Sequence, residues 1–573
     1  MRAMLVVMGI LIGASIAGAT TYVVAPSGGD FTTIQAALDV AIAGDTILVK
    51  DNPSAYHEKL AFPRNGNASA GPITLRAYPG HHPIVDGTGV TGANMMLLHN
   101  RSYVSVIGFE IRNNSNVNDG SGIRITGSGA FLELRDNVIH DMRGVGAMGI
   151  TVYGTSASAS ISDLIIAGNQ IHDCEPADSE ALVLNGNVER FAVTGNVVRD
   201  VNNVGIDFIG GEADINPSFV ARNGVCAGNL VERANANYGG GFAAGIYVDG
   251  GKDIVVRGNV VTQSDLGIEI GAENAGIVVT GVVVRDNVLY GNLQAGLVFG
   301  GYDSTAGRVN SCQFLGNTCF KNDTTGQFLG ELWINWASDN VVHDNIFYST
   351  AQNVLLYSEN GNVNNALDFN TWYAEAGAGN AEFVWRNSQY TGFAAYRAGS
   401  GQDGHSLFAD PKFVDSATAN FALQSASPAI DAGNPADQLA STDIAGSPRC
   451  LDGHLTGVMV IDCGAYEFDH ARLAVSGSAT PGGVLQIDVT GTAGLKSYLW
   501  VGTQPGETAF RPFGALLFGF GAPWIVTPWG TIPSSTQVTL PPSLPPGLAI
   551  ITQILGVAAP AGNTSNAVTI VVH

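Results

Sequence analysis

The sequence predicts a right-handed parallel β-helix, because one asparagine and the apolar residues around it return at a nearly constant interval. The asparagine recurs every 25 to 33 residues. Its positions are Asn137, Asn169, Asn196, Asn229, Asn259, Asn287, Asn317, Asn345 and Asn370. Apolar residues stand three positions before it and two positions after it in coil after coil. This repetition is typical of a solenoid in which each coil packs on its neighbours, and stacked asparagines can hydrogen-bond from coil to coil.

A second strand of alternating polarity occurs in each repeat, as in G-I-R-I-T and G-I-Y-V-D. The strands begin at Gly122, Gly149, Ala181, Gly205, Gly245, Gly267, Gly296, Glu331 and Asn353. The period of two points two apolar side chains inward and the side chain between them outward. Nine such coils, each rising ~4.8 Å, predict a rod on the order of 45 Å long.

Residues 1–19 are expected to be a secretory signal peptide. Arg2 gives the positive start, Leu5 to Ile12 form the apolar run, and Ala17-Gly18-Ala19 provides a small-residue cleavage site. The apolar run is too short to span a bilayer, and no similar run follows it. We therefore expect a protein without a membrane span that is secreted or held on a bacterial cell surface.

The β-helix is predicted for residues 20–404. Near its start, F-T-T-I-Q-A-A-L-D-V-A reads as a short amphipathic helix that would cover the open end of the solenoid. Residues 405–470 form a less regular segment. Residues 471–573 are rich in Thr, Pro, Gly and β-branched residues, which indicates a small, β-sandwich-like C-terminal domain. We expect a monomer.

The composition restricts the partners. The net charge is −23 with only 13% charged residues, and the sequence has no basic stripe, which argues against nucleic-acid binding. An acidic polysaccharide would need bridging cations or a local Lys/Arg cluster. Of the six cysteines, Cys226, Cys312 and Cys319 fall on the inward ladders and are expected to be small buried side chains. Cys450 and Cys463 bracket a loop and are expected to form a disulfide.

The N-terminal region resembles a known group of proteins. The motifs D-F-T-T-I-Q-A-A-L-D, A-G-D-T-I-L-V, G-P-I-T-L-R-A-Y-P-G and P-I-V-D-G lie between Tyr22 and Gly89. They resemble the opening of secreted β-helix proteins of the pectin-lyase-like superfamily, which includes pectate lyase L, chondroitinase B and β-helix glycosidase types. The resemblance covers roughly residues 21–375. G-I-Y-V-D-G-G at Gly245 is similar to the G-I-Y-L-D-D segment of some β-helix glycosidases, with Asp249 aligned.

A second resemblance concerns the less regular segment. S-P-A-I-D-A-G at Ser427, T-D-I-A-G-S-P-R at Thr442 and D-C-G-A-Y-E-F at Asp462 resemble the choice-of-anchor Q domain that follows β-helices in bacterial surface proteins. This resemblance implies export and surface display rather than chemistry.

Three carboxylates occupy outward positions of consecutive second strands. Asp207, Asp249 and Glu269 are placed so that neighbouring members have backbones about 8 Å apart. Such pairs suit glycoside hydrolysis, in which one carboxyl protonates the leaving oxygen and another is a nucleophile or base. The same three could instead bind calcium, and no cofactor other than calcium is indicated. A third interpretation is that they are ordinary solvated surface charges.

Aromatic side chains near this trio suit the flat faces of sugars, although they could also be packing residues of the solenoid. The candidate substrate-binding residues are Tyr153, Tyr247, Lys252, Tyr302, Trp333 and Trp336. The leading expectation is a polysaccharide-active enzyme that cleaves a glycan by hydrolysis or by lyase chemistry. The alternative is a non-catalytic surface β-helix that binds glycans or adheres.

Overall fold

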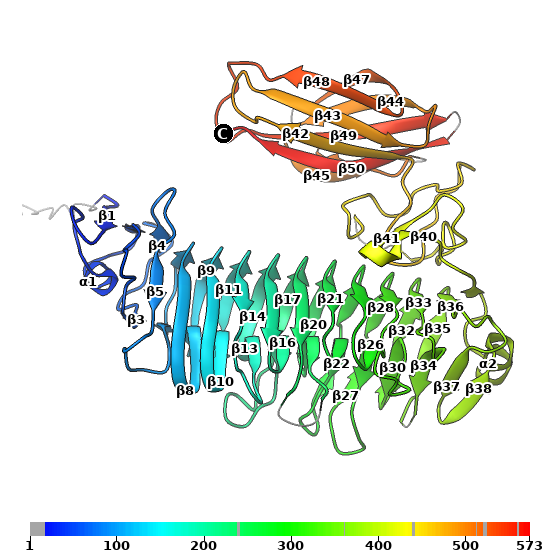
Figure 1. Ribbon diagram of the computed structural model, residues 1–573, viewed down its shortest axis with the longest axis horizontal. Coiled ribbons are helices and arrows are strands. Elements are labelled where there is room, and N and C mark those ends of the chain that lie inside the picture. Colours follow the sequence, from blue (N-terminus) through cyan, green and yellow to red (C-terminus); the bar gives the residue numbers. More distant parts are fainter. Residues whose placement is uncertain are drawn as a thin grey trace, which may run out of the picture.

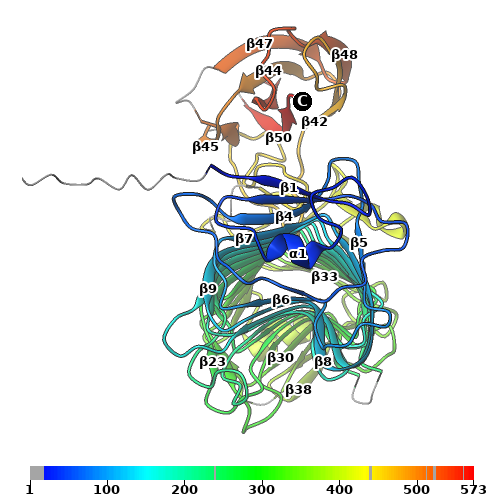
Figure 2. The same cartoon turned by 90° about the vertical axis from the view of Figure 1, so that its left-hand side faces the viewer.

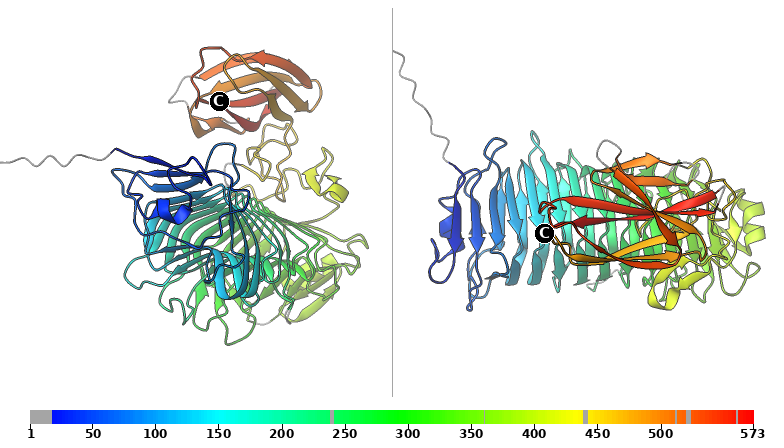
Figure 3. Two further views of the ribbon diagram at one scale, coloured as in Figure 1. Left: turned by 60° about the vertical axis from the view of Figure 1, so that its left-hand side comes forward. Right: turned by 90° about the horizontal axis from the view of Figure 1, so that it is seen from above.

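The computed structural model describes residues 18–237, 241–359, 361–437, 442–510, 513–519, 524–558 and 561–573. It shows a long parallel β-helix with a separate β-rich domain above its C-terminal half, joined by an irregular segment (Figure 1). The view from above shows the same placement of the domain over the stacked coils (Figure 3). Residues 1–17, which contain most of the predicted signal peptide, lie outside the described residues. No helix in the described ranges is long and apolar enough to cross a membrane.

The coils build three ladders of parallel strands. The first ladder is a sheet of 13 strands. In order, it contains β1 (Thr21–Val24), β2 (Thr46–Val49), β4 (Ile73–Ala77), β7 (Val104–Ile107), β9 (Gly129–Arg135), β11 (Ile161–Ala167), β14 (Val188–Thr194), β17 (Arg222–Ala227), β20 (Lys252–Arg257), β24 (Val283–Arg285), β28 (Gln313–Leu315), β32 (Val341–His343) and β35 (Ala366–Asp368). The predicted nine coils are those from β9 onward. The four preceding coils lack the ladder asparagine, but they lie within the β-helix that the sequence predicts from residue 20.

The second ladder follows the asparagines. It contains β5 (Ile84–Asp86), β8 (Glu110–Thr126), β10 (Val138–Gly154), β12 (Gln170–His172), β15 (Val197–Val201), β18 (Leu230–Ala234), β21 (Val260–Thr262), β25 (Val288–Tyr290), β29 (Thr318–Phe320), β33 (Ile346–Tyr348), β36 (Thr371–Tyr373) and β39 (Leu407–Phe408). The strands β8 and β10 are 17 residues long and continue into the third ladder.

The third ladder carries the alternating strands that the sequence predicts. Besides β8 and β10, it contains β3 (Leu60–Ala61), β6 (Met96–His99), β13 (Glu180–Gly186), β16 (Val204–Ile209), β19 (Ala244–Asp249), β22 (Leu266–Gly271), β26 (Ala295–Gly300), β30 (Leu332–Asn335), β34 (Val354–Ser358), β37 (Glu382–Trp385) and β38 (Ser388–Thr391). A short outer sheet is formed by β23 (Val278–Val279), β27 (Arg308–Asn310) and β31 (Ala337–Ser338).

The stacked asparagines hold consecutive coils together, as predicted. The Nδ2 of Asn229 donates to Oδ1 of Asn259 at 2.9 Å and to the carbonyl of Val193 at 3.0 Å. Its own Oδ1 accepts from the backbone N–H of Asn196 at 2.9 Å. The pattern repeats from Asn137 to Asn370, where every ladder asparagine is buried. Each one thus satisfies backbone groups that would otherwise be buried without partners.

Both ends of the solenoid are covered. Helix α1 (Ile34–Leu38) lies across the N-terminal opening (Figure 2) and buries Ile34, Ala37 and Leu38. Its first N–H groups donate to the Glu58 carboxylate, at 2.8 Å from Ile34 and 2.9 Å from Gln35. At the other end, the antiparallel β37–β38 pair and α2 (Phe393–Ser400) cover the last coil, where Tyr396 stacks on Phe383 at 4.4 Å.

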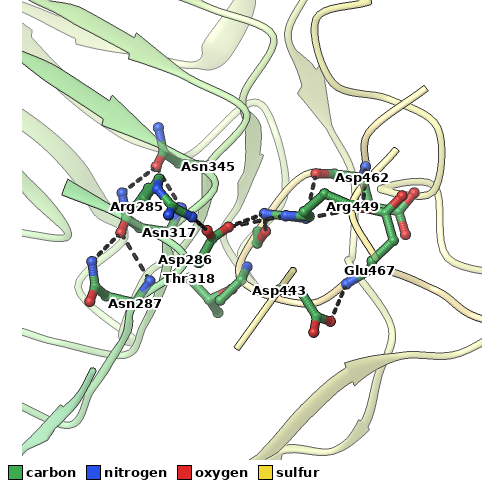
Figure 4. Close-up of polar contacts among 12 residues, drawn as sticks. Arg285, Asp286, Asn287, Asn317, Thr318, Asn345, Asp443, Arg449, Asp462 and Glu467 are labelled. Carbon is green, nitrogen blue, oxygen red and sulfur yellow. Dashed lines mark hydrogen bonds and ion pairs between the residues drawn. The ribbon is translucent and has the colours of Figure 1, made fainter. Parts of the chain in front are cut away.

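The irregular segment after β39 docks on the β-helix through a buried ion network. It contains β40 (Phe413–Asp415), η1 (Ser416–Thr418) and β41 (Asn420–Leu423). The Arg449 guanidinium bonds to Asp286 of the β-helix at 2.6 Å and to Glu467 of its own segment at 3.1 Å (Figure 4). The side chains of Arg449, Asp286 and Glu467 are almost fully buried.

The predicted Cys450–Cys463 disulfide is not formed. Cys463 is a buried free thiol whose Sγ donates to the carbonyl of Phe369 on the β-helix at 3.2 Å. Burial raises the pKa of this thiol above its usual range. The prediction failed because other contacts hold this region. Glu467 accepts hydrogen bonds from Arg449 and from the backbone N–H of Leu451, and the Cys463 side chain points toward Phe369 of the β-helix.

The C-terminal domain consists of two antiparallel sheets and a two-stranded ribbon. One sheet contains β42 (Ala471–Gly477), β43 (Val484–Gly491) and β48 (Ser534–Thr539). The other contains β47 (Trp524–Thr531), β44 (Lys496–Gly502), β49 (Ala549–Ala558) and β50 (Ala561–Val571), and the ribbon is β45 (Pro505–Ala509) with β46 (Ala515–Phe518). Its separate hydrophobic clusters agree with the predicted β-sandwich-like domain.

Candidate functional site

A pocket of about 630 Å³ opens on the outward side of the third ladder, around β13, β16, β19 and β22. This ladder lies on the side of the β-helix that faces away from the C-terminal domain (Figures 1 and 2). The lining residues are Asp178, Glu180, Asn203, Val204, Asp207, Ile209, Glu212, Ala236, Gly241, Phe242, Tyr247, Asp249, Leu266, Glu269, Glu273, Tyr302 and Trp333. All three carboxylates of the predicted trio therefore line one cavity.

Strand register places the trio as the sequence predicts. Asp207 of β16 pairs with Tyr247 of β19, and Tyr247 pairs with Glu269 of β22. Asp249 lies two residues after Tyr247 on the same strand. With ~4.8 Å between coils and ~3.3 Å per residue, the Cα of Asp249 lies about 8 Å from the Cα atoms of both Asp207 and Glu269. The backbone thus fixes Asp249 between two other carboxyl groups.

The trio is much less exposed than outward positions of a solenoid usually are. Asp207 is 2% exposed and Asp249 is 4% exposed. The loops after β16 and before β19 form part of the pocket wall. They lie in the 40-residue interval between the Gly205 and Gly245 strands and contribute Glu212, Ala236, Gly241 and Phe242 to the lining. Asp207 and Asp249 are therefore not the solvated surface charges of the third interpretation, and Glu269 is partly buried beside them.

Backbone hydrogen bonds orient two of the three carboxyls. Oδ1 of Asp249 accepts from the backbone N–H of Glu273 at 2.8 Å. Oδ1 of Asp207 accepts from the backbone N–H of Phe208 at 2.6 Å. In each case one oxygen is held, and the second oxygen of the same carboxyl is left for the pocket.

Four further acidic residues in the pocket were missed by sequence reasoning: Asp178, Glu180, Glu212 and Glu273. Glu180 is the first residue of β13. Glu212 and Glu273 follow the ends of β16 and β22 in the related segments I-G-G-E and I-G-A-E. This repeated ending was the available signal, because equivalent turns of neighbouring strands bring their side chains to the same edge of the ladder.

The acidic groups have no cationic partners. Within the described parts of the chain, no Lys, Arg or His lines the pocket and none of its seven Asp and Glu side chains forms an ion pair. Buried carboxylates without a counter-charge are rare, since both desolvation and mutual repulsion disfavour ionisation.

These two effects raise the pKa values of five carboxyls in the pocket. Burial, together with the nearby Glu212 and Asp249, raises the pKa of Glu180 to about 8. Burial and the charge of Glu273 raise the pKa values of Asp249 and Glu269 to about 8. Burial followed by the charge of Glu180 raises the pKa of Asp207 well above its usual range, and burial followed by Glu212 raises that of Glu273. The pocket therefore holds several protonated carboxyls at neutral pH.

Aromatic side chains form the remaining wall. Tyr247 is buried between the carboxyls, whereas Tyr302 is 66% exposed and Phe242 is 52% exposed. The rings of Phe242 and Trp333 lie 6.2 Å apart. The buried indole N–H of Trp333 has no hydrogen-bond partner in the described residues. Three of the predicted aromatics, Tyr247, Tyr302 and Trp333, thus accompany the trio.

The other three predicted binding residues lie outside this pocket. Tyr153 packs on Met148, Val183 and Ile209, and the Arg124 guanidinium covers its ring at 5.1 Å. Lys252 begins β20 of the first ladder, where it pairs with Arg222.

The ring of Trp336 is covered by the guanidinium of Arg308 at 4.9 Å. Trp336 follows β30, and its backbone has a φ of 47°, so it has left the strand that carries Trp333.

The outward ladder also differs from the prediction at its last coil. Trp333 pairs with Tyr357, whereas the sequence pattern placed Leu355 at this position. An irregularity between Val354 and Leu356 shifts the register, and Leu355 is buried in the core.

The calcium alternative finds no preformed site. Among the described residues, no three His, Cys, Asp or Glu side chains are grouped so that they could hold a metal ion.

Comparison with known proteins gives one clear relative. The chain is 33% identical over 433 residues to the uncharacterized protein YwoF of Bacillus subtilis (strain 168), covering 71% of this chain and 91% of YwoF. No protein-family model matches the chain.

Solved structures with some similarity to the chain share far less sequence. XylC in complex with xylose has 12% identity and a TM-score of 0.40, covering 69% of this chain and 87% of that one. Pectate lyase Pel9A has 13% identity and a TM-score of 0.39, covering 79% and 97%. The family 28 exopolygalacturonase of Yersinia enterocolitica has 11% identity and a TM-score of 0.37, covering 61% and 75%.

Proposed function

The chain belongs to the family of YwoF from Bacillus subtilis, and for this chain we propose that the acidic pocket hydrolyses glycosidic bonds of a polysaccharide. The observation that supports the proposal is the gathering of Asp207, Asp249 and Glu269 in one pocket with aromatic walls. Glycosidases need two carboxyl groups on opposite sides of the scissile bond, one protonated and one ionised.

The proposed proton donor is Asp249. Its Oδ1 is held by the N–H of Glu273, so the proton is carried by the other oxygen. Burial and the charge of Glu273 raise its pKa to about 8, which keeps the carboxyl protonated at neutral pH. Asp249 also lies between the other two members of the trio, so that a sugar bound to either of them is within its reach.

The proposed nucleophile or base is Glu269. Its pKa is raised to about 8, like that of Asp249, so the acid–base pair exists in the molecules in which Glu269 has lost its proton before Asp249. The greater exposure of Glu269 favours this order, because water stabilises its anion better. Because the carboxyls repel each other's charge, they lose their protons one after another, and ionised and neutral groups coexist. Asp207 remains protonated and donates a hydrogen bond to a sugar hydroxyl.

The bond changes are those of hydrolysis. The glycosidic C–O bond breaks while its oxygen takes the proton of Asp249, and the oxygen of water becomes bonded to the anomeric carbon. Glu269 either takes the proton of that water or first forms a glycosyl ester that water then cleaves. Both routes leave one new reducing end. In the ester route Asp249 regains its proton from the water that cleaves the ester, whereas after the direct route the proton on Glu269 leaves to solvent and Asp249 takes one from solvent.

Lyase chemistry has less support from this pocket. Elimination from a uronate requires a positive group that stabilises charge developing beside the abstracted proton. The lining in the described residues offers carboxyls and aromatics, and Lys252, the predicted cation, lies on another ladder. Glycan binding without cleavage remains the second candidate, and it is favoured by the exposed rings of Tyr302 and Phe242.

Two product assays on one panel of polysaccharides test the proposal, with and without calcium. Reducing ends without absorbance at 235 nm are the expected result. Reducing ends together with unsaturated product would show a lyase. Binding without either product across the panel would replace the hydrolase proposal with the binding function.

A further inference from the structure

The pocket is lined by more carboxyl side chains than glycoside hydrolysis requires. Two or three carboxyls suffice for the chemistry, yet Glu180, Glu212 and Glu273 also line the cavity. No cationic side chain of the described residues compensates them. Elsewhere in the same protein, the buried Asp286 and Glu467 are paired with Arg449. The buried Glu331 and Asp403 instead accept hydrogen bonds from side chains that enclose them.

We propose that the pocket binds a sugar unit bearing a free ammonium group, so that the substrate is an amino-sugar glycan rather than a polyuronate. This proposal rests on the proposed function, because it names the substrate class of the same site. An ammonium group supplies the positive charge that the chain itself does not provide. It can donate to several carboxylates at once in strong, charge-assisted hydrogen bonds.

Two buried side chains support a cationic ligand independently of the number of acids. Asp207 and Asp249 are nine-tenths buried or more and line the cavity, and within the described parts of the chain each accepts a hydrogen bond from one backbone N–H alone. Each therefore has acceptor capacity left for a ligand.

The aromatic wall points to the same ligand chemistry. Tyr247, Trp333 and Tyr302 line the pocket together with the carboxyls. Ring faces attract cations, and they also pack on the apolar faces of sugars. A neutral sugar can use the rings and the protonated carboxyls but cannot balance those that ionise, whereas a uronate would add a further negative charge to the pocket.

Binding of a ligand with an ammonium group should release protons from the pocket, which a neutral ligand should not do. An ammonium group stabilises the ionised form of nearby carboxyls and so lowers their pKa values. The pocket carboxyls carry protons at neutral pH because burial and mutual repulsion raise the pKa values of Glu180, Asp249 and Glu269 to about 8. Binding of the ammonium sugar must therefore release protons to the solvent.

The test compares matched ligands on the full chain carrying Asp249→Asn, which prevents turnover. Calorimetry at pH 6.5 measures binding of β-1,4-linked glucosamine oligomers, their N-acetylated counterparts and oligogalacturonate with and without calcium. We expect the free-amine oligomer to bind at least about tenfold more tightly than the acetylated one, a difference of ~1.4 kcal/mol. We also expect proton release, seen as a dependence of the binding enthalpy on the ionisation enthalpy of the buffer.

Two charge-removing variants locate the effect. Glu212→Gln combined with Glu273→Gln should reduce the preference for the free amine at least about threefold, since each ion pair in a partly buried site contributes on the order of 1 kcal/mol or more. Glu375→Gln removes an exposed carboxyl on another part of the β-helix and should leave the preference unchanged. Circular dichroism and thermal unfolding confirm that the variants are folded.

The outcomes separate this inference from the hydrolase proposal. Equal binding of free and acetylated oligomers, tighter binding of oligogalacturonate, or no binding of any amine oligomer up to about 10 mM overturns the ammonium-sugar inference. Hydrolysis of a neutral glycan could still stand in those cases. Conversely, tight, proton-releasing binding of the amine oligomer with no cleavage by the unsubstituted protein would support the ligand class and refute the hydrolase.

Discussion

Replacing Asp249 by asparagine separates chemistry from folding more cleanly than any other change in this pocket. Asparagine has nearly the same shape as aspartate, and its Oδ1 can still accept from the N–H of Glu273, now 2.8 Å from Oδ1 of Asp249. The change removes a buried acid whose ionised form is disfavoured by burial and by the charge of Glu273. The free energy of unfolding should therefore stay unchanged or increase.

The loss of activity should be large. With a pKa of about 8, Asp249 carries a proton in about nine molecules of ten at pH 7. An amide has no such proton to transfer. General acid catalysis contributes ~10²–10⁴-fold, so kcat should fall by that factor, which is ~3–5 kcal/mol in the activation barrier.

The assay is the release of reducing ends on a cleaved glycan, with thermal unfolding measured on the same samples. Asp253→Asn is the matched control, because it is the same substitution at an exposed residue of β20, the next strand along the chain. Activity equal to that of the unsubstituted protein in the Asp249→Asn variant would refute the proposed proton donor. A large drop in unfolding temperature would assign Asp249 a structural role.

Three further predictions concern pH and stability. The pKa of Asp249 is about 8 in the folded protein and ~3.9 in the unfolded chain, so between these pH values the folded state binds more protons. The free energy of unfolding, measured in urea, should therefore fall as the pH rises from about 4 to about 8 and then level off. Activity should fall above pH 8. Asn229→Ala should lower the free energy of unfolding by roughly 2–4 kcal/mol in guanidinium titrations, since it leaves the N–H of Asn196 and the carbonyl of Val193 on the preceding coil without these partners. A loss below about 0.5 kcal/mol would contradict the ladder's role. Arg449→Met should cost about 3–5 kcal/mol and increase proteolysis of the segment around it, because the buried Glu467 loses its counter-charge and Asp286 loses one of two. Arg472→Met at an exposed site should have neither effect.

The repeating features of the fold could be predicted because they depend on local pattern alone. The asparagine ladder and the outward register of Asp207, Tyr247 and Glu269 follow from the spacing of identical motifs in neighbouring coils. Where the asparagine is absent, as in the coils of β1, β2, β4 and β7, its spacing could not count the coils, and they were predicted only as part of the β-helix that begins at residue 20. The shifted register at Leu355 has the same origin, since one irregularity changes the inward and outward positions.

The environment of the site could not be predicted, because it depends on how the loops fold over the ladder. The sequence placed Asp249 at an outward position, which is normally solvated, but the loops of the neighbouring coils bury it. The same loops bring Glu212 into the pocket with Glu273. Lys252 was predicted to lie beside the trio because it is only seven positions after Gly245 in the sequence, but it lies on the first ladder and not on the third.

The most direct test of the hydrolase proposal is the fate of water oxygen during cleavage. When a glycan that the protein cleaves is incubated in ¹⁸O-labelled water, hydrolysis must place one labelled oxygen at the anomeric carbon of each new reducing end. Mass spectrometry at early times, corrected by a preformed product kept in the same water, measures this label. We predict one ¹⁸O per cleavage, no absorbance at 235 nm, and loss of both cleavage and label in the Asp249→Asn variant. Cleavage without label and with unsaturated ends, or labelling that survives in Asp249→Asn, would contradict the account.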